Sequence, residues 1–528
     1  MISNGVAKFL KENFVLLCIL AAAFVFRFAL IDQLPAGLFP DEAANGLDVN
    51  SILSGDLKPF YERGNGREAL FFYVISAVVA LFGRGPWQHH IVSAGFGFFT
   101  VVAAYFLTKR LFGKNVAYLA AFFMATSSFA VTISRTAFRA NLAPFFVTMT
   151  VLFLVKLWQE TDPAKRYWPA AIAGISFALG FYSYISYRMM IPLLIAFKIV
   201  LLIAYRGKIM QMFREYWKPK LVAGAAFLIT IFPLAYYFIT HPGSFVGRAG
   251  HVSIFSKDLN NGDILGTFWG VFKLTMLGFF TNGDTNWRHN IAGFPFLSPI
   301  ISILFGVSLV VFTLAGLKFL KDAWQKKLEP KTFFMAIVAA LFWAMLVPEV
   351  TTAEGIPHGL RLIGVMPAIF IMAAWSANWL WEKLKNHAGQ HSRTVIAVLF
   401  LSFIFIYNFV LYFGVAASSP EYYYAFRSDL TVVSQYLNER RSQRTTYLSL
   451  DKFSVQTVEY FTTESGTPYI LVDPANTYQV KLNPGDVVVF TMSTLYDRIR
   501  FKETHPEAKL ILQERNKFGQ IIMEVYSE

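Results

Sequence analysis

Charged residues are scarce in this sequence, and cysteine is almost missing from it. Only 15% of the 528 residues are Asp, Glu, Lys or Arg, whereas soluble globular domains carry about 25%. The shortage of charge therefore argues against a soluble enzyme and for a membrane protein. Cys18 is the single cysteine, which excludes an intramolecular disulfide, so cysteine usage carries no information about the redox compartment.

Long apolar runs take the place of the missing charge. Hydrophobic residues make up 55% of the chain and aromatic residues 17%. Many of the runs approach the ~20 residues that a helix needs to cross a bilayer, so we predict an α-helical polytopic membrane protein with about eleven transmembrane helices. The predicted spans are 14–31, 88–107, 114–132, 142–158, 169–184, 189–205, 221–239, 298–317, 332–348, 362–381 and 394–416.

The basic residues set the predicted orientation in the membrane. The chain has a formal charge of +14, and the excess of Lys and Arg lies in short loops between the apolar runs, which indicates membrane topology and not nucleic-acid binding. The apolar stretch 68–83 is short for a span, and the basic loops all fall on one side only if it does not cross. The N-terminus is then cytoplasmic. Residues 1–31 contain Arg27 and lack a clear small-x-small cleavage site, which favours an uncleaved first span over a signal peptide.

The composition changes after residue 416. Residues 417–528 hold 12 basic and 14 acidic residues. Four β-rich runs, TTYLSL, DVVVFTM, AKLILQE and QIIMEVY, alternate there with polar helical patterns such as DLTVVSQYLNER, as expected of a small α/β domain. We therefore predict a transmembrane domain over residues 1–416 and an extracytoplasmic α/β domain over residues 417–528.

The unusual polar residues all fall in segments that this topology places outside. The first such loop contains LFPDEAANG, with the adjacent acids Asp41 and Glu42 among apolar neighbours. A partly desolvated carboxylate can act as a general base on an acceptor hydroxyl, and converging arginines can hold a phosphate through forked hydrogen bonds. Further polar residues of the outer loops are candidates for binding the substrate: Arg67, Arg139, Tyr184, Arg188, Arg288, His289, Glu354, His358 and Arg361.

Each of these features also has a purely structural interpretation. Asp41 follows Pro40 and precedes AANGLDVNSIL, an amphipathic helical pattern, so the acid pair could cap a helix. Arginines at the ends of spans, such as Arg139 and Arg188, can anchor helices in the interface. The tyrosines of SYISYR could form an aromatic belt, and the spacing of the histidines does not indicate metal ligands. The functional interpretation rests on the occurrence of all these motifs on one face.

Several segments, taken in order, resemble the GT-C superfamily of polytopic glycosyltransferases. The similarity is closest to its family 39, in particular to prokaryotic members; this family type includes protein O-mannosyltransferases and the related lipid A aminoarabinose transferase. It covers most of residues 10–416. The segments are FPDEA, REALFFYVISAVVALFG, ISRTAFRANLAPFF, YSYISYRMMIP, GDTNWRHNIAGFPFLSP and EGIPHGLRLIGVMP.

The resemblance implies a reaction and its partners. Such enzymes take a sugar from a polyprenyl-phosphate donor and transfer it, with inversion, on the non-cytoplasmic side of the membrane. The expected partners are therefore a polyprenyl-phosphate sugar, a hydroxyl-bearing acceptor (protein, lipid or glycan) and the bilayer of the plasma membrane, with no nucleic acid. The resemblance makes Asp41 the catalytic base, with Glu42 beside it. It assigns no metal ligands, although a divalent metal stays open. Members of the family often carry a further acid in the second outer loop. In this chain that loop reads SRTAFRAN and contains no acid.

Two other functions fit parts of the sequence. A polytopic lipid or sugar transporter or flippase would place ionisable residues within its spans and would often show internal repeats, whereas here the charges gather at one face and no repeat is visible. The second alternative is a GT-C enzyme with a pyrophosphate-linked donor. The oligosaccharyltransferases among these enzymes carry a WWDYG-like stretch, which this chain lacks. An inactive scaffold would not need the acidic pair.

The topology can be tested by cysteine labelling, because Cys18 is the only native thiol. We expect a cysteine at position 326 to react with a membrane-impermeant reagent from the cytoplasmic side, and cysteines at position 284 and within 417–528 to react from the outside. Labelling of position 284 from the cytoplasm would contradict this orientation.

Overall fold

The computed structural model describes residues 2–64, 66–246, 252–440 and 444–528. The chain divides into two compact units. The first unit comprises Met1–Ala29, Lys58–Phe71 and Ile91–Ala416. The second comprises Leu30–Leu57, Phe72–His90 and Ala417–Glu528, so two segments from the N-terminal part of the chain share a unit with the C-terminal segment.

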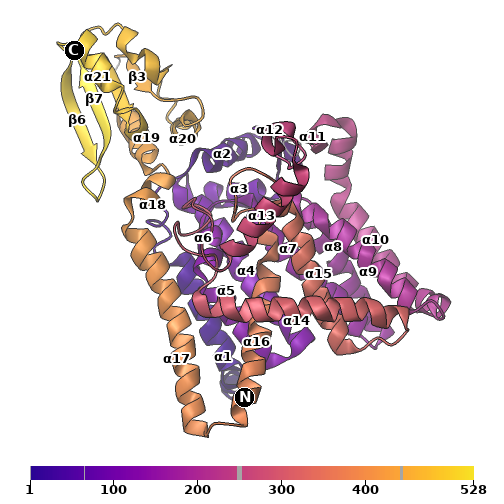
Figure 1. The fold of residues 1–528 in the computed structure, drawn as a ribbon. Coiled ribbons are helices and arrows are strands. Elements are labelled where there is room, and N and C mark those ends of the chain that lie inside the picture. The colour runs from indigo at the N-terminus through magenta and orange to yellow at the C-terminus, as the bar shows by residue number, and fades with distance from the viewer. Residues whose placement is uncertain (1, 65, 247–251, 441–443) are drawn as a thin grey trace. The chain divides into compact units, whose positions relative to one another are not determined.

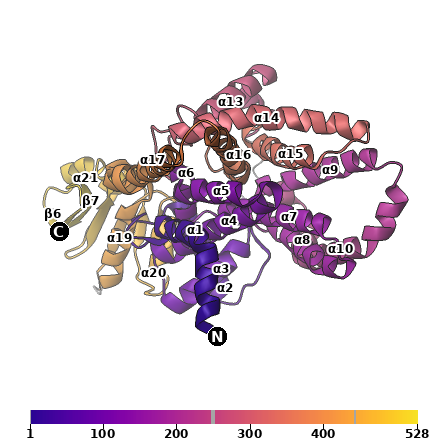
Figure 2. The same cartoon turned by 90° about the horizontal axis from the view of Figure 1, so that it is seen from below.

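The first unit is built from helices. Figures 1 and 2 both show α8 lying beside α10, and α7 and α14 pack against α8 and α15 respectively. The helices are α1 (Ile2–Phe28), α4 (Pro86–Phe112, whose first turn belongs to the second unit), α5 (Lys114–Thr126), α6 (Ser128–Arg135), α7 (Leu142–Gln159), α8 (Tyr167–Gly180), α9 (Met190–Ala204), α10 (Ile209–Thr240), α11 (Gly243–Val246), α12 (Lys257–Asn260), α13 (Ile264–Gly278), α14 (Pro299–Trp324), α15 (Pro330–Val350), α16 (Met366–Lys385) and α17 (Gln390–Phe409).

Eight described helices are long and apolar enough to cross a membrane, or nine if the bent pair α5 and α6 forms one span. They overlap nine of the predicted spans. The other two predicted spans, 14–31 and 169–184, are helical as α1 and α8, but the apolar part of α1 lies between Glu12 and Arg27 and α8 has only 14 residues. In the described ranges, helix length and composition therefore support nine of the eleven predicted spans. They do not support the spans 14–31 and 169–184.

The short apolar stretch 68–83 contains a helix, α3 (Leu70–Phe82), of 13 residues. At 1.5 Å per residue it is about 20 Å long, which is shorter than the ~30 Å hydrocarbon core of a bilayer. Its length therefore agrees with the prediction that it does not cross the membrane. Two short strands, β1 (Phe60–Tyr61) and β2 (Arg67–Glu68), pair antiparallel just before it.

Buried arginines stabilise the break between α5 and α6, which meet at Ser127 with a bend of 58°. A helix end leaves carbonyl oxygens without intrahelical partners, and such groups are costly away from water. Arg27 donates from Nη1 to the carbonyl of Ala125 at 2.9 Å and from Nη2 to that of Met124 at 3.1 Å. Arg135, at the end of α6, donates back to two carbonyls at the end of α1. These bonds hold the end of α5 at the break and tie α6 to the end of α1.

The second unit contains the predicted C-terminal α/β domain. Its five-stranded sheet has the order β4-β3-β5-β7-β6, with β3 parallel to β4 and β5 and the other neighbours antiparallel. All four predicted strands are present, together with a fifth, β4, which was not predicted. The strands are β3 (Thr446–Ser449), β4 (Ile470–Val472), β5 (Val487–Thr491), β6 (Lys509–Arg515) and β7 (Ile521–Ser527).

Helices cover both faces of this sheet. Successive side chains of β5 point to opposite faces, and all five are buried. Val487 and Val489 pack with α19 (Ser428–Glu439) and α20 (Val455–Thr462), whereas Val488 and Phe490 pack with Phe501 of α21 (Arg498–Thr504). Helix α19 confirms the predicted helical pattern 429–440 up to Glu439. The short helix α18 (Pro420–Ala425) precedes α19.

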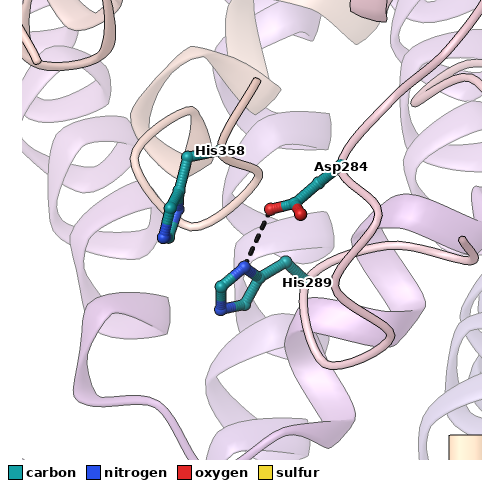
Figure 3. A group of neighbouring side chains, drawn as sticks. All are labelled: Asp284, His289 and His358. Atoms are coloured by element: carbon teal, nitrogen blue, oxygen red, sulfur yellow. Dashed lines mark hydrogen bonds and ion pairs between the residues drawn. The ribbon is translucent and has the colours of Figure 1, made fainter. Parts of the chain in front are cut away.

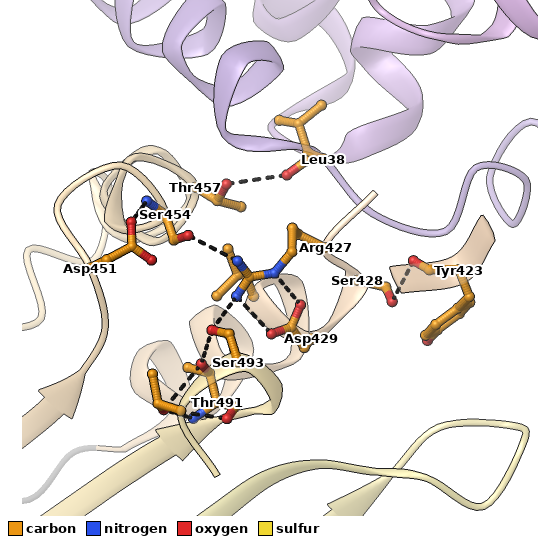
Figure 4. A network of polar contacts seen from close by, with 12 residues as sticks. Leu38, Tyr423, Arg427, Ser428, Asp429, Asp451, Ser454, Thr457, Thr491 and Ser493 are labelled. Atoms are coloured by element: carbon orange, nitrogen blue, oxygen red, sulfur yellow. Dashed lines mark hydrogen bonds and ion pairs between the residues drawn. The ribbon is translucent and has the colours of Figure 1, made fainter. Parts of the chain in front are cut away.

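Helix α2 (Pro40–Leu53) packs against α20 within the second unit. Leu38 and Ala43 form a small apolar cluster with the buried ring of Tyr460. The Thr457 hydroxyl donates to the carbonyl of Leu38 at 3.2 Å, next to the Arg427–Asp429 ion pair that Figure 4 shows. The Tyr460 hydroxyl in turn shares a 2.9 Å hydrogen bond with His89 Nε2. The C-terminal domain therefore holds the helix that carries the acidic pair.

The contact between α2 and α20 predicts the effect of one substitution. A Cβ added at Gly46 would lie 2.6 Å from two ring carbons of Tyr460, and the hydrogen bond to His89 holds that ring in place. We expect Gly46→Ala to destabilise the protein by about 1–3 kcal/mol, the usual cost of overpacking, and to lower its thermal unfolding temperature. Gly270→Ala is the matched control, because a Cβ there meets no atom within 4 Å. Equal unfolding temperatures for the two variants would contradict this packing.

Candidate functional site

Arg139, Glu68 and Tyr184 meet in the first unit at the ends of apolar helices. Arg139 lies just after the end of α6, and its Nε lies 3.1 Å from Glu68 Oε2. The Glu68 side chain is 5% exposed and that of Arg139 is 21% exposed. The guanidinium carbon of Arg139 lies 5.8 Å from the centre of the Tyr184 ring. This ion pair is therefore anchored and largely withdrawn from water.

Only part of the Arg139 guanidinium is used by this pair. Within the part of the chain that the structure describes, Nη1 and Nη2 of Arg139 donate no hydrogen bond to the protein. Arg188 lies within electrostatic range of Glu68 as well. Its Nη1 donates to the carbonyl of Phe245 at 2.9 Å, and its guanidinium lies 4.3 Å from the Phe245 ring centre. Two of the predicted arginines thus flank one buried carboxylate.

Glu349, near the end of α15, is a second buried carboxylate of the first unit, and its side chain is fully buried. Its Oε1 accepts the His358 N–H at 2.8 Å and the Thr275 hydroxyl at 3.4 Å. Arg361 lies within electrostatic range of both Glu349 and Tyr184. Arg361 also donates to the carbonyl of Glu354 and lies 3.8 Å from its carboxylate. Glu349 therefore fixes the loop that carries the predicted His358, Glu354 and Arg361.

Asp284, His289 and His358 form a compact group, shown in Figure 3. Asp284 Oδ2 lies 2.8 Å from His289 Nδ1 and accepts the Gly359 N–H at 2.8 Å. The two imidazole ring centres are 4.4 Å apart. Burial raises the pKa of Asp284, but the hydrogen bond from His289 and backbone N–H groups outweigh it and lower the pKa. Burial also lowers the pKa of both histidines, so both rings are neutral at pH 7.

The adjacent acids Asp41 and Glu42 lie in the second unit, and their burial differs sharply. Asp41 is exposed in the first turn of α2, whereas Glu42 is completely buried. Glu42 Oε2 accepts the Phe39 N–H at 2.9 Å, and its Oε1 lies 3.7 Å from His90 Nε2. The helical pattern predicted after Pro40 is confirmed, and Glu42, not Asp41, provides the side chain that caps it.

The first unit thus brings together many predicted binding residues. They lie around Glu68, Glu349 and Asp284, three acids that were not among the candidate site residues predicted from the sequence. No local signal in the sequence singles out these three acids. Arg67 and Arg288 are half-buried in the same unit, and their roles stay predictions, as does the catalytic role of Asp41.

Comparison with known proteins agrees with this architecture. The model of one family, described as dolichyl-phosphate-mannose-protein mannosyltransferase, matches residues 69–237. The archaeal oligosaccharyltransferase AglB from Archaeoglobus fulgidus, in complex with an inhibitory peptide and a dolichol-phosphate, matches with a TM-score of 0.51 at 12% identity, over 98% of this chain and 74% of that one. An oligosaccharyltransferase of the same organism, tethered to an acceptor peptide, matches with a TM-score of 0.51 at 13% identity over the same shares of each chain.

A third structure, ArnT from Cupriavidus metallidurans bound to undecaprenyl phosphate, matches with a TM-score of 0.48 at 13% identity, over 97% of this chain and 98% of that one. No curated protein matches the sequence. The chain has the GT-C fold. At such low identity the archaeal structures speak for the fold alone. The family model, which is named for glycosyl transfer, matches residues 69–237 and agrees with the resemblance to polytopic glycosyltransferases stated from the sequence.

Glu349 provides a test of the loop arrangement. Glu349→Ala leaves the His358 N–H and the Thr275 hydroxyl without their acceptor, and each unsatisfied buried polar group costs about 1–3 kcal/mol. We expect a clearly lower thermal unfolding temperature for the purified variant. Glu354→Ala is the matched control, because that side chain is 48% exposed and surface ion pairs contribute about 0–1 kcal/mol. A Glu349→Ala variant as stable as the control would refute this role.

Proposed function

We propose that the protein is an inverting membrane glycosyltransferase that uses a polyprenyl-phosphate sugar as donor and a hydroxyl group as acceptor, on the extracytoplasmic face. The observation that carries the proposal is the pair of arginines, Arg139 and Arg188, near the buried carboxylate of Glu68 at the ends of apolar helices. A lipid-linked sugar phosphate needs an apolar surface for its tail and cations for its phosphate, and this region of the first unit offers both.

The geometry of Arg139 suits a phosphate. Its Nε is bound to Glu68, while Nη1 and Nη2 donate to no other described residue of the protein. These two nitrogens form a planar fork, and such forks bind phosphate oxygens through two parallel hydrogen bonds. Because Glu68 is buried, its charge holds the guanidinium in one orientation. Arg188 uses one of its terminal nitrogens for the Phe245 carbonyl and supplies a second positive charge.

The relatives support the choice of a lipid phosphate as ligand. The matched family is named for mannosyl transfer from dolichyl phosphate, and the archaeal oligosaccharyltransferase of the same fold is described in complex with a dolichol-phosphate. Arg361 and Glu354 bind each other, so we assign to them the positioning of their loop. Arg67 and Arg288 complete the proposed set of donor contacts.

Asp41 is the proposed general base. It is exposed at the start of α2, and therefore accessible to an acceptor, whereas Glu42 is committed to the Phe39 N–H and faces His90. In the reaction, Asp41 takes the proton of the acceptor hydroxyl while the oxygen attacks the anomeric carbon, and the sugar–phosphate bond breaks to release polyprenyl phosphate. Glu42 holds the helix that presents Asp41, with the help of the packing around Tyr460.

The phosphate contact predicts the behaviour of a conservative substitution. Arg139→Lys keeps the charge but replaces a fork by a point charge, and hydrogen bonds to charged groups contribute about 1.5–3 kcal/mol. We expect kcat/KM for the donor to fall about tenfold or more in a transfer assay with purified protein. The matched control is Arg110→Lys, because Arg110 is bound to Gln159 in an exposed contact. Equal activity of both variants would leave Arg139 with an anchoring role only.

The two acids predict different losses of activity. Asp41→Asn removes the base, and general-base catalysis contributes about 100- to 10,000-fold in rate, so we expect transfer to fall by that factor while donor binding and folding persist. Glu42→Gln keeps the size of the side chain and should retain partial activity with a lower unfolding temperature. Sugar transfer at the native rate by Asp41→Asn would assign the base to another residue, with Glu354 the next candidate.

A further inference from the structure

We propose that Asp284, His289 and His358 bind a divalent metal ion, with Zn²⁺ as the best match, and that the ion joins two loops of the first unit. Asp284 and His289 lie between α13 and α14, and His358 lies between α15 and α16. One ligand atom of each residue lies within 4.8 Å of the others. The three side chains converge from two loops that are about 70 residues apart in the sequence.

The donor set selects the ion. Two imidazole nitrogens and one carboxylate oxygen are donors that Zn²⁺ accepts, and three protein ligands leave a fourth tetrahedral position open. Mg²⁺ and Ca²⁺ prefer oxygen ligands only. At the usual Zn–N distance of about 2.0–2.1 Å, two ligand atoms of a tetrahedral site lie ~3.3 Å apart. The 2.8 Å between Asp284 Oδ2 and His289 Nδ1 is close to that spacing. All three ligand atoms lie within 4.8 Å of one another, and rotation of the His358 side chain brings its ring nitrogen closer to the other two.

Unused polar atoms mark the same place. Nδ1 of His358 is buried and has no hydrogen-bond partner among the described residues, and the same holds for Oε2 of Glu349. Buried polar groups normally find a partner, so an orphaned imidazole nitrogen beside a second imidazole and a carboxylate is explained by a ligand that the three share. Both rings are held close together, with centres 4.4 Å apart.

The surroundings hold the ligands in position and offset the charge of the ion. Glu349 Oε1 binds the backbone N–H of His358, and Asp284 accepts the N–H groups of Asn286 and Gly359. Loss of such contacts to ligand residues typically lowers metal affinity by about 10- to 100-fold. Asp284 supplies a negative charge beside the ion, while the nearby Arg361 is paired with Glu354. A metal here clamps the loop after α13 to the loop after α15, independently of how the donor binds.

The test uses the purified full-length protein in detergent, with any affinity tag removed, first treated with a chelator and then dialysed against Zn²⁺. We expect elemental analysis to find about one zinc ion per chain and the thermal unfolding temperature to rise with free Zn²⁺, because a ligand that binds only the folded state stabilises it. Asp284→Asn and His358→Ala should lose both effects. His391→Ala is the matched control, since His391 is exposed in α17, and it should keep both.

Zinc binding that disappears in the His391→Ala control, or that persists in both site variants, would overturn the proposal, as would a wild-type protein without stoichiometric zinc. X-ray absorption at the zinc edge of the wild-type protein keeps the test independent of variant folding. Two imidazole ligands with oxygen donors are expected there, and a spectrum with fewer than two imidazoles would also overturn it.

Discussion

A carboxylate that leaves water must be paired, and this constraint organises the polar part of the first unit. Glu68 is buried and holds Arg139 through its Nε. Glu349 is buried and accepts the backbone N–H of His358. Asp284 is buried and accepts from His289 and Gly359. Each acid thereby fixes a loop or turn that the apolar helices alone would leave free, and the resulting positions of the arginine and histidine side chains follow from these pairings. The second unit uses the same device, since buried Glu42 caps the helix that exposes Asp41.

Arginines have two different roles in the first unit, and their hydrogen bonds distinguish them. Arg27 and Arg135 use both terminal nitrogens on backbone carbonyls at helix ends, so they replace intrahelical bonds that the bent helices have lost. Arg139 uses only its Nε within the described ranges, which leaves a fork for an anion. In the proposed reaction this fork and Arg188 hold the donor phosphate, in a region where low dielectric strengthens each contact. The metal clamp we infer would steady the neighbouring loops without touching these two arginines.

Local sequence properties account for most of the fold and for little of the site. Apolar runs near 20 residues marked eight or nine of the spans, and period-2 alternation marked four of the five strands, because both signals lie within a single element. The strand β4, of three residues, is too short to carry such a signal. The pairing of Glu68 with Arg139, or of Asp284 with His358, joins residues about 70 positions apart, and no local pattern encodes it. The adjacent acids Asp41 and Glu42 were recognised as a pair, but their opposite burial depends on packing against Phe39 and His90.

The central claim is that the protein consumes a sugar linked to a lipid through one phosphate. The most direct measurement incubates the purified wild-type protein and solubilised membranes as acceptor source with polyprenyl-phosphate sugars, in parallel with matching pyrophosphate-linked sugars, and follows the lipid products by mass spectrometry. We expect release of polyprenyl phosphate from a monophosphate donor and transfer of its sugar with inverted anomeric configuration. Consumption of pyrophosphate-linked donors alone, or movement of intact lipid-linked sugar across vesicles without release of polyprenyl phosphate, would contradict it.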